Sequence, residues 1–108
     1  MAQKNPIWTH YASIDLDSIL DHTAFKFPKR LEKTYEEIMS AVEKIGKHPK
    51  AGRIVPELKA FNITMYREQV VNTWRIIYRF EGATPILLGI IDGRRDMSDI
   101  IRQRVLSD

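Results

Sequence analysis

The stretch that decides the fold lies in the last third of the chain. It consists of the run TWRIIYRF at residues 73–80 and the run ILLGIIDGRRDM at residues 86–97. In the first run, Arg75, Ile77 and Arg79 fall on one side of an extended chain, and aromatic or apolar residues fall on the other. The second run begins with residues that are nearly all apolar, which is typical of a strand covered on both faces. Together, the two runs predict the centre of a sheet that ends in a cluster of arginines.

Further strands are predicted before these two runs. We expect strands at residues 66–71 and about 55–62, and the alternation at residues 6–12 predicts a short first strand. Glycine and proline at residues 81–85 predict the turn between the two central strands. Residues 96–99 are expected to open a short C-terminal helix, whose apolar side is formed by Ile100, Ile101, Val105 and Leu106.

The residues between the first and second strands predict two helices. Ser13 or Asp15 can cap the first helix by accepting hydrogen bonds from free backbone N–H groups, and the helix should end before Pro28. The second helix has the clearest helical repeat in the chain, beginning near Pro28 and ending near Gly46. Because the connection is short, the two helices should form an antiparallel hairpin. The apolar side of the second helix is formed by Leu31, Tyr35, Ile38, Met39, Val42 and Ile45.

This order of elements predicts an α+β fold. An N-terminal strand and an α-helical hairpin pack on a mainly antiparallel, twisted sheet of four to five strands, and a short C-terminal helix follows. With 108 residues, the chain is expected to form one domain over residues 1–108. It has no cysteine, which excludes disulfides and thiolate metal sites. We find no run long enough to span a bilayer and no signal-like segment, so we expect a cytoplasmic protein.

The positive charge is concentrated in the second half of the sequence. The net charge is +3, and eight of the nine arginines follow residue 52. Arginine offers a planar fork of donors that matches phosphate and carboxylate, so this concentration is consistent with a binding face. It is equally consistent with a preference of strands for arginine and of helix surfaces for lysine, and charge alone does not decide between them.

The sequence holds few candidates for catalysis. It has no glycine-rich phosphate loop and no histidine pair at metal-ligand spacing. The three histidines lie in the first half, away from the arginine cluster: His10, His22 and His48. Three acidic residues suggest a cation site: Asp92, Asp96 and Asp99. Because Arg94 and Arg95 lie among them, ion pairing within the chain is the simpler interpretation, and no metal or cofactor is expected.

Four phrases of the sequence are distinctive when taken together. They are GRIVPEL at residues 52–58, YRE at 66–68, YR at 78–79 and IDGRRDM at 91–97. With the predicted order of elements, they resemble the RelE/ParE superfamily of bacterial toxins over nearly the whole chain. The resemblance implies the toxin of a type II toxin–antitoxin pair, often encoded on plasmids. Such a toxin is neutralised by a small cognate antitoxin in a hetero-oligomeric complex.

Members of this superfamily divide by target. RelE-like members cut messenger RNA on the ribosome, whereas ParE-like members poison DNA gyrase and do no chemistry themselves. Attack of a 2′-hydroxyl on phosphate needs groups that transfer protons and cations that hold the phosphate. The ribonuclease members usually carry a tyrosine or histidine close to the C-terminus, but no tyrosine or histidine follows Tyr78, and nothing after Phe80 is aromatic. This departure favours the ParE-like branch.

A metal-independent messenger ribonuclease remains the alternative function, and an inert binding module is a third hypothesis. The residues that a ribonuclease would use are four arginines and one phenol: Arg75, Arg79, Arg94, Arg95 and Tyr66. Arg75 and Arg79 also have a simpler interpretation as residues of the sheet surface. In that interpretation they pair with acidic neighbours, which are Glu68, Glu81 or Asp92.

For a ParE-like toxin, we hypothesise two contact surfaces. Gyrase would be contacted by Arg94, Arg95, Arg102 and Arg104, with Asp92 and Asp96 fixing the turn that orients them. An antitoxin with an acidic, amphipathic segment would suit a face where basic side chains lie beside exposed apolar ones. The candidates for antitoxin binding are Leu16, Leu20, Tyr35, Ile38, Val55, Leu58 and Phe61.

Overall fold

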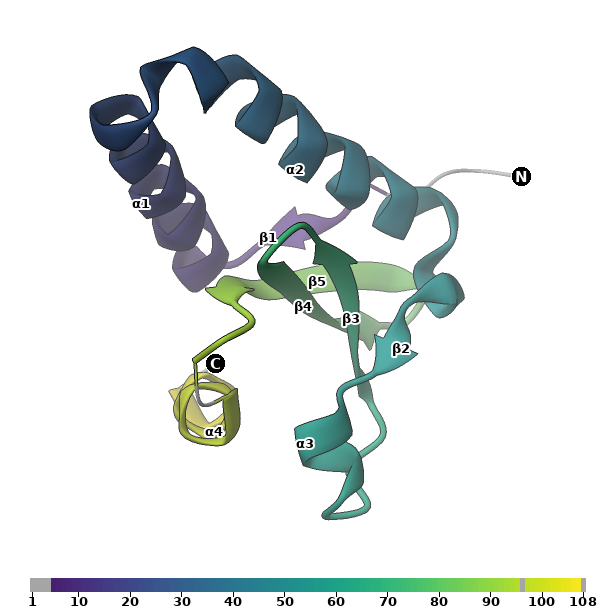
Figure 1. Ribbon diagram of the computed structural model, residues 1–108. Coiled ribbons are helices and arrows are strands. Elements are labelled where there is room, and N and C mark those ends of the chain that lie inside the picture. Colours follow the sequence, from purple (N-terminus) through teal and green to yellow (C-terminus); the bar gives the residue numbers. More distant parts are fainter. Residues whose placement is uncertain (1–4, 96, 108) are drawn as a thin grey trace.

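The protein is built on a five-stranded sheet with the strand order β1-β5-β4-β3-β2 (Figure 1). The computed structural model describes residues 5–95 and 97–107, and the side chains of residues 5–95 and 97–104. β1 runs parallel to β5, and the other neighbouring strands are antiparallel. The predicted α+β class and mainly antiparallel sheet are therefore confirmed. The strands are β1 (Ile7–Trp8), β2 (Arg53–Ile54), β3 (Tyr66–Val71), β4 (Trp74–Glu81) and β5 (Thr84–Asp92).

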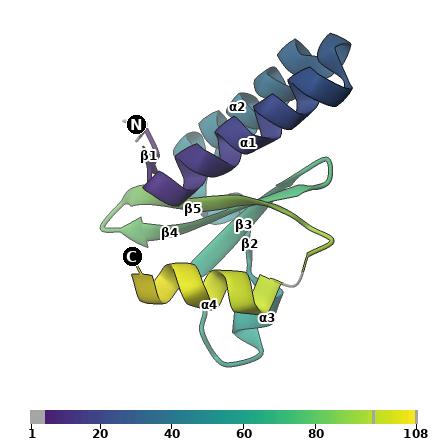
Figure 2. The ribbon, with the colours of Figure 1, turned by 90° about the vertical axis from the view of Figure 1, so that its left-hand side faces the viewer.

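Helices cover both faces of the sheet. α1 (His10–Lys26) and α2 (Leu31–Lys47) form the expected hairpin on one face, with a 3-10 turn at Pro28–Arg30 between them. The short helix α3 (Pro56–Lys59) and the C-terminal helix α4 (Met97–Ser107) lie on the opposite face, as the turned view in Figure 2 shows. The sheet therefore separates a hairpin face, under α1 and α2, from an α3–α4 face.

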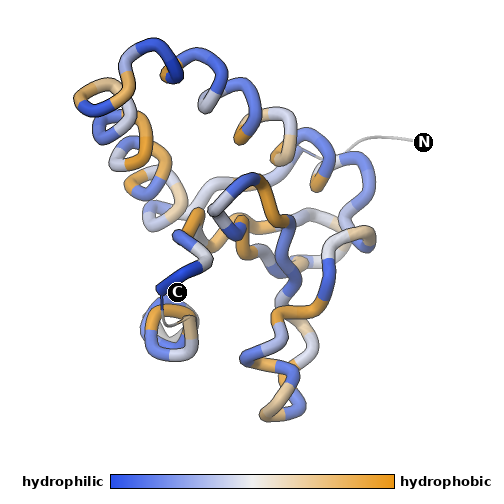
Figure 3. Tube along the Cα trace, viewed as in Figure 1, coloured by the Kyte–Doolittle hydropathy of each residue, from blue (hydrophilic) through white to orange (hydrophobic). Residues whose placement is uncertain are grey.

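α2 packs on the sheet through one apolar side. Ile38, Val42 and Ile45 are buried, and in Figure 3 the hydrophobic positions of α2 recur on the side nearer the sheet. Burial of one such side chain stabilises a fold by about 1.5–3 kcal/mol, so this side of α2 fixes the hairpin in place. The three residues share a core cluster with Ala12, Ile76, Tyr78, Leu87 and Ile90.

The side chains of β3 and β4 divide between the two faces as the sequence alternation predicts. Ile76 belongs to the core cluster of the hairpin face, whereas Ile77 belongs to the cluster of the α3–α4 face. Tyr66 lies directly opposite Arg79 in the ladder, and residues directly opposite share a face. The predicted grouping of Arg75, Ile77 and Arg79 on one face is confirmed, because Arg75 contacts residues of that face as well.

α4 is held against the sheet by a small apolar contact. Met97 and Ile101 are buried, and Ile100 packs against the same cluster. That cluster also contains Val55, Leu58, Tyr66, Ile77, Leu88 and Ile91. The helix and its apolar side at residues 100 and 101 are confirmed. The side chains of Val105 and Leu106, predicted for the same side, lie outside the described residues.

The first strand is shorter than predicted, and the first helix begins earlier. β1 ends at Trp8 because Thr9 caps α1: the Thr9 side chain accepts a hydrogen bond from the backbone N–H of Ala12 at 3.3 Å. A threonine hydroxyl at this position satisfies one of the free N–H groups of the first turn. The predicted cap at Ser13 or Asp15 is therefore wrong.

The strand predicted at residues 55–62 is also wrong. β2 has only two residues, and the chain then enters α3 at Pro56. Proline has no N–H for a sheet ladder, and its fixed φ suits the first turn of a helix, so Pro56 ends the strand and starts the helix.

Three smaller boundaries differ from the prediction. α2 starts at Leu31 rather than near Pro28 and continues through Gly46, and the 3-10 turn Pro49–Ala51 follows it. Pro85 lies inside β5 instead of in the turn before it.

Over the described ranges 5–95 and 97–107, no helix has the length and apolar content needed to cross a membrane.

Candidate functional site on the α3–α4 face

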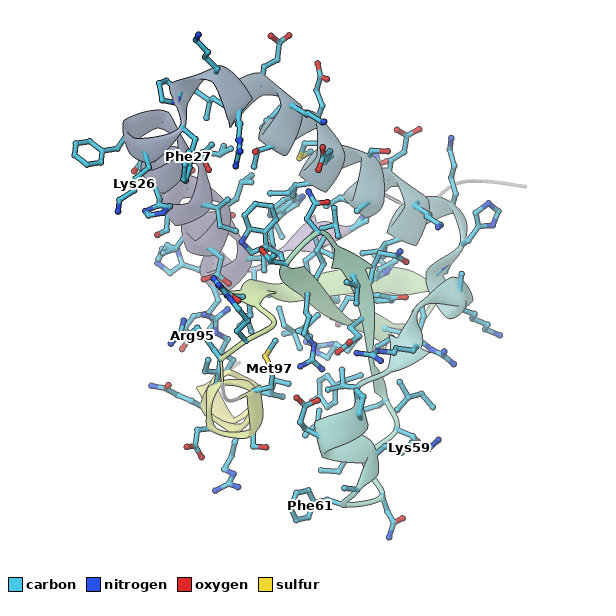
Figure 4. All side chains as sticks on the ribbon, in the orientation of Figure 1. Lys26, Phe27, Lys59, Phe61, Arg95 and Met97 are labelled. Atoms are coloured by element: carbon cyan, nitrogen blue, oxygen red, sulfur yellow. The ribbon has the colours of Figure 1, made fainter. Side chains whose placement is uncertain are left out.

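Two arginines are exposed in the turn that follows β5. Asp92 holds the first of them by accepting hydrogen bonds from the Arg94 backbone N–H at 2.9 Å and from Arg94 Nη2 at 2.7 Å. The hydrogen bonds from Arg94 lower the pKa of Asp92 to about 2, so this carboxylate is ionised at neutral pH. Arg95 is exposed. In Figure 4, Met97 points into the space between α4 and the sheet, whereas Arg95 lies outside that space. Asp96, predicted to support the turn, lies outside the described residues.

A groove separates α3 from α4 and opens to solvent beside Arg102. Its volume is about 320 Å³. Arg102, which the sequence predicts for target contact, is exposed on α4 and lines this groove. In Figure 4, Phe61 projects from the end of α3 toward the side where α4 lies. The residues that define this α3–α4 groove are Glu57, Leu58, Phe61, Ile63, Tyr66, Ser98 and Arg102.

Arg104 is directed toward α1 and is used inside the protein. Its guanidinium forms an ion pair with Asp15, and Nη2 donates to Oδ1 at 3.1 Å. It also lies over the ring of Tyr11, with 5.1 Å between the guanidinium carbon and the ring centre. Because its side chain is only 16% exposed and its guanidinium is paired with Asp15, Arg104 does not fit the predicted contact with a target. We therefore correct that prediction.

The Asp15–Arg104 pair depends on a glycine in β5. Asp15 Oδ2 also accepts a hydrogen bond from the backbone N–H of Ile90 at 2.9 Å, and Arg104 Nη1 donates to the Leu88 carbonyl at 3.3 Å. A Cβ on Gly89 would overlap Arg104 Nη1 and would lie 3.0 Å from Asp15 Oδ2. Asp15 and Arg104 are 89 positions apart, so sequence reasoning missed this link between α1 and α4.

Arg75 is buried among carboxylates instead of being displayed. It donates two hydrogen bonds of 2.7 Å to Glu57 of α3, and its Nε donates to Glu68 at 2.9 Å. Glu68 is buried as well, and it also pairs with Arg53 Nη2 at 2.6 Å. The hydrogen bond between Arg75 and Glu57 raises the pKa of Arg75 and lowers that of Glu57. The interpretation of Arg75 as paired with Glu68 is confirmed, and Arg75 is not available to hold a phosphate.

The positions of Tyr66 and Arg79, which were also proposed for a ribonuclease, neither support nor exclude that role. Tyr66 is 7% exposed and lines the α3–α4 groove, on the same sheet face as Arg79. Arg79 forms an ion pair with Glu81, one of its predicted partners, with 3.8 Å between Nη1 and Oε2. The Glu81 carboxylate is exposed.

All three histidines are described. Each is exposed on α1 or after α2, and none lines the groove. The described residues contain no group of three His, Asp or Glu that could hold a metal ion.

The residues predicted to bind an antitoxin divide between surface and core. Ile38 and Val55 are both 0% exposed, so neither offers a docking surface, and these two predictions are wrong. Their apolar character serves packing against the sheet. Leu58 and Phe61 line the α3–α4 groove, where Phe61 is exposed.

The remaining three candidates belong to the helical hairpin. Leu16 packs against the hairpin core, whereas Leu20 and Tyr35 line a hollow of about 390 Å³ near the connection between α1 and α2. Beyond the hollow, sequence reasoning missed Phe25 and Phe27, which are exposed at this end of the hairpin, where Figure 4 labels Phe27. Their signal was present in the sequence, because both aromatic residues lie outside the apolar sides that were assigned to the two helices.

Comparison with known proteins now defines the class. Residues 7–97 match the family model of the ParE toxin of the type II toxin–antitoxin system parDE. The chain therefore belongs to the ParE toxin family, whose systems pair a toxin with an antitoxin. A solved structure of the chromosomal ParDE TA system from P. aeruginosa has a similar fold, with a TM-score of 0.67 and 22% sequence identity. That match covers 83% of this chain and 96% of the other. No curated protein matches significantly.

Proposed function

We propose that this ParE-family toxin acts by binding DNA gyrase and that Arg94, Arg95 and Arg102 form the contact surface. One observation carries the proposal: Arg94 and Arg95 are exposed in the turn between β5 and α4, and Arg102 is exposed on α4 itself. Arginine supplies directed hydrogen bonds and charge without exchanging protons at neutral pH. A toxin that works by binding needs such groups and does not need an acid–base pair.

The surroundings of the three arginines support a mechanism without catalysis. A general acid or base must lie within hydrogen-bond reach of the atom it serves. The histidines lie on α1 or after α2 and none of them lines the α3–α4 groove, and the buried arginine of the sheet, Arg75, is committed to Glu57 and Glu68. In this proposal the chain is not an enzyme, and Asp92 holds the exposed Arg94 side chain by accepting hydrogen bonds from its Nε and Nη2.

A supercoiling assay with purified gyrase tests the proposal. We expect the folded toxin to inhibit supercoiling, and the triple variant Arg94→Ala, Arg95→Ala, Arg102→Ala to need at least about 100-fold more protein, because hot-spot arginines contribute roughly 1–2 kcal/mol each. The control is Arg30→Ala, which removes an arginine stacked on Phe27 at the far end of the hairpin. Unhindered supercoiling at an excess of folded toxin would refute gyrase as the target. Equal inhibition by the triple variant would refute the contact surface.

One observation favours the ribonuclease alternative and defines its test. Tyr66 brings a phenol to the same groove that Arg102 lines. The variant Tyr66→Phe removes only the hydroxyl, so a ribonuclease that uses this group would lose activity while gyrase inhibition would stay. Primer extension on translated messages after toxin induction reads the two outcomes. Codon-phased cuts that disappear in Tyr66→Phe would establish the ribonuclease and refute our proposal.

Membership of the family also implies a cognate antitoxin, and we propose two surfaces for it. The first is the hollow at the hairpin connection with Leu20 and Tyr35, and the second is the α3–α4 groove with Leu58 and Phe61. Both combine apolar side chains with concave shape, which suits an amphipathic segment. The complex of toxin and antitoxin would then be a hetero-oligomer in which both surfaces are covered.

A further inference from the structure

The fold leaves two phenylalanines in water at the end of the helical hairpin. Phe25 is 85% exposed in the last turn of α1, and Phe27 is 47% exposed just after that helix. The guanidinium of Arg30 stacks on the Phe27 ring, with 4.8 Å between the guanidinium carbon and the ring centre, so Phe27 is partly covered. Phe25 has the largest exposed fraction of the large apolar side chains that the structure describes. Burying such a ring in a partner is favourable by about 1.5–3 kcal/mol.

A hollow that could receive a ring lies beside Phe25. Its volume is about 390 Å³, and it opens at the connection between α1 and α2. Asp21 lines the hollow and lies one helical turn before Phe25, so both side chains lie on the same side of α1. Phe25 does not fill the hollow of its own copy, because its ring is almost fully exposed. The residues that line the hollow are Leu20, Asp21, Ala24, Leu31, Glu32 and Tyr35.

Charges of both signs are exposed at this end of the hairpin. Asp21 and Glu32 are exposed at the hollow, whereas Lys26 and Lys29 are exposed in the last turn of α1 and in the 3-10 turn after it. Figure 4 labels Lys26 beside Phe27. None of the four forms an ion pair with any residue that the structure describes. A matching occupant therefore carries a cation for each carboxylate and a carboxylate for each lysine.

The same end of a second copy supplies this complement. A purely anionic surface would suit Lys26 and Lys29, but it would also meet the carboxylates of Asp21 and Glu32. In a dimer with a two-fold axis, each contact is made twice. We infer that the free toxin forms a symmetric dimer through its hairpin ends. Phe25 of each copy enters the hollow of the other, and Lys26 and Lys29 of each copy face Asp21 and Glu32 of the other.

The position and size of this interface define what the dimer can do. Figure 2 shows the connection between α1 and α2 on the side of the sheet opposite α4, so the dimer leaves Arg102 accessible. The inference thus goes beyond the proposed function and needs neither gyrase nor antitoxin. An interface made by two hairpin ends is small, so we expect a weak dimer that dissociates at micromolar concentration. Because the hollow is also one of the surfaces proposed for the antitoxin, the dimer describes the free toxin.

Sedimentation velocity over a series of toxin concentrations tests the apolar contact. Phe25→Ala removes the ring from both halves of the symmetric interface, and we expect the dimer Kd to rise about 10- to 100-fold. Thermal unfolding of the variant should match that of the wild type, because the side chain is exposed. A wild type that stays monomeric at every concentration would overturn the inference, and so would a Kd that Phe25→Ala leaves unchanged.

A charge exchange tests the ionic contacts more sharply. The variant Lys26→Glu with Lys29→Glu carries only acidic groups at these four positions, and the variant Asp21→Lys with Glu32→Lys carries only basic ones. Each alone should dimerise at least about 10-fold more weakly than the wild type, because like charges meet twice. An equal mixture of the two variants restores opposite charges at both contacts, so a mixed dimer should form with a Kd within about 3-fold of the wild-type value. A fault in folding could not produce this rescue.

A matched control separates the contact from a general effect of charge. Lys44→Glu with Lys50→Glu makes the same change in net charge in the last turn of α2 and in the 3-10 turn after it, at the other end of that helix. We expect this control to dimerise like the wild type. An equal loss in the control, or no mixed dimer from the two charge variants, would refute the contacts. If the toxin is monomeric and the Lys26 and Lys29 variant instead loses affinity for phosphatidylglycerol vesicles, a lipid surface is the occupant and the inference is wrong.

Discussion

The two faces of the sheet are stabilised in different ways. The hairpin face is filled by apolar and aromatic side chains, among them Ile38, Tyr78 and Leu87, which are fully buried. The α3–α4 face joins a second apolar cluster to a charge network of two arginines and two glutamates, of which Arg75 and Glu68 are buried, and it leaves a groove open. The comparison distinguishes a face that holds the fold together from a face where buried charge and an open surface lie side by side. Our proposals place the gyrase contact of Arg102 and one of the two antitoxin surfaces on the second face.

The largest effect is expected from a change in the hairpin core. Ile38→Ala removes a fully buried side chain from under α2, and such truncations cost about 2–5 kcal/mol of unfolding free energy. The control Ile63→Ala makes the same change on the rim of the groove, where the partly exposed side chain should cost less than about 1 kcal/mol. Urea unfolding of both variants measures the difference. Equal losses would show that the two faces do not differ in the way we describe.

A somewhat smaller loss is expected when the charge network is broken. Glu68→Gln keeps the size of the side chain but removes the charge that Arg53 and Arg75 share, and we expect a loss of roughly 3 kcal/mol. The matched control Glu43→Gln changes an exposed carboxylate paired with Lys47 and should stay within about 0.5 kcal/mol. The measurement is again urea unfolding. A loss below about 1 kcal/mol in Glu68→Gln would mean that the buried network contributes no more than a surface ion pair.

The phrase GRIVPEL, which carried much of the family resemblance, describes the fold rather than the contact surface. Gly52 leaves room for the hydroxyl of Tyr78, which an added Cβ would overlap. Arg53 pairs with Glu68, and Glu57 pairs with Arg75. Each of these residues serves packing or the charge network of the α3–α4 face. The motif therefore located the chain in its family, whereas the gyrase contacts that we propose lie elsewhere in the sequence.

Local patterns predicted the elements well, because alternation and helical repeats depend on neighbours in the sequence. They predicted β3, the faces of β4 and the buried side of α2. The same repeat could not separate Tyr35, which is exposed, from Ile38, which is buried, because their burial depends on where the sheet lies. The exposed groove and the partner of Arg104 arise only when distant segments meet, so no local pattern contained them.

The smallest effect should come from the link between the two faces. Gly89→Ala places a methyl group where Arg104 reaches Asp15, so the ion pair must open, while the apolar contacts of Met97 and Ile101 keep α4 in place. We expect a loss of about 1.5 kcal/mol, the lower end of the usual contribution of hydrogen bonds to charged groups.

A double-mutant cycle decides whether this loss belongs to the ion pair. If Gly89→Ala acts by displacing Arg104, then Arg104→Ala alone should cost a similar amount, and the double variant should cost little more than either single change. Additive losses would show that the methyl group disturbs β5 itself and that the pair is dispensable. Hydrogen exchange gives an independent reading, because opening the pair should speed exchange in α4 and leave α2 unchanged. Faster exchange in both helices would mean that the hairpin face also depends on this contact, and the distinction between the two faces would then have to be given up.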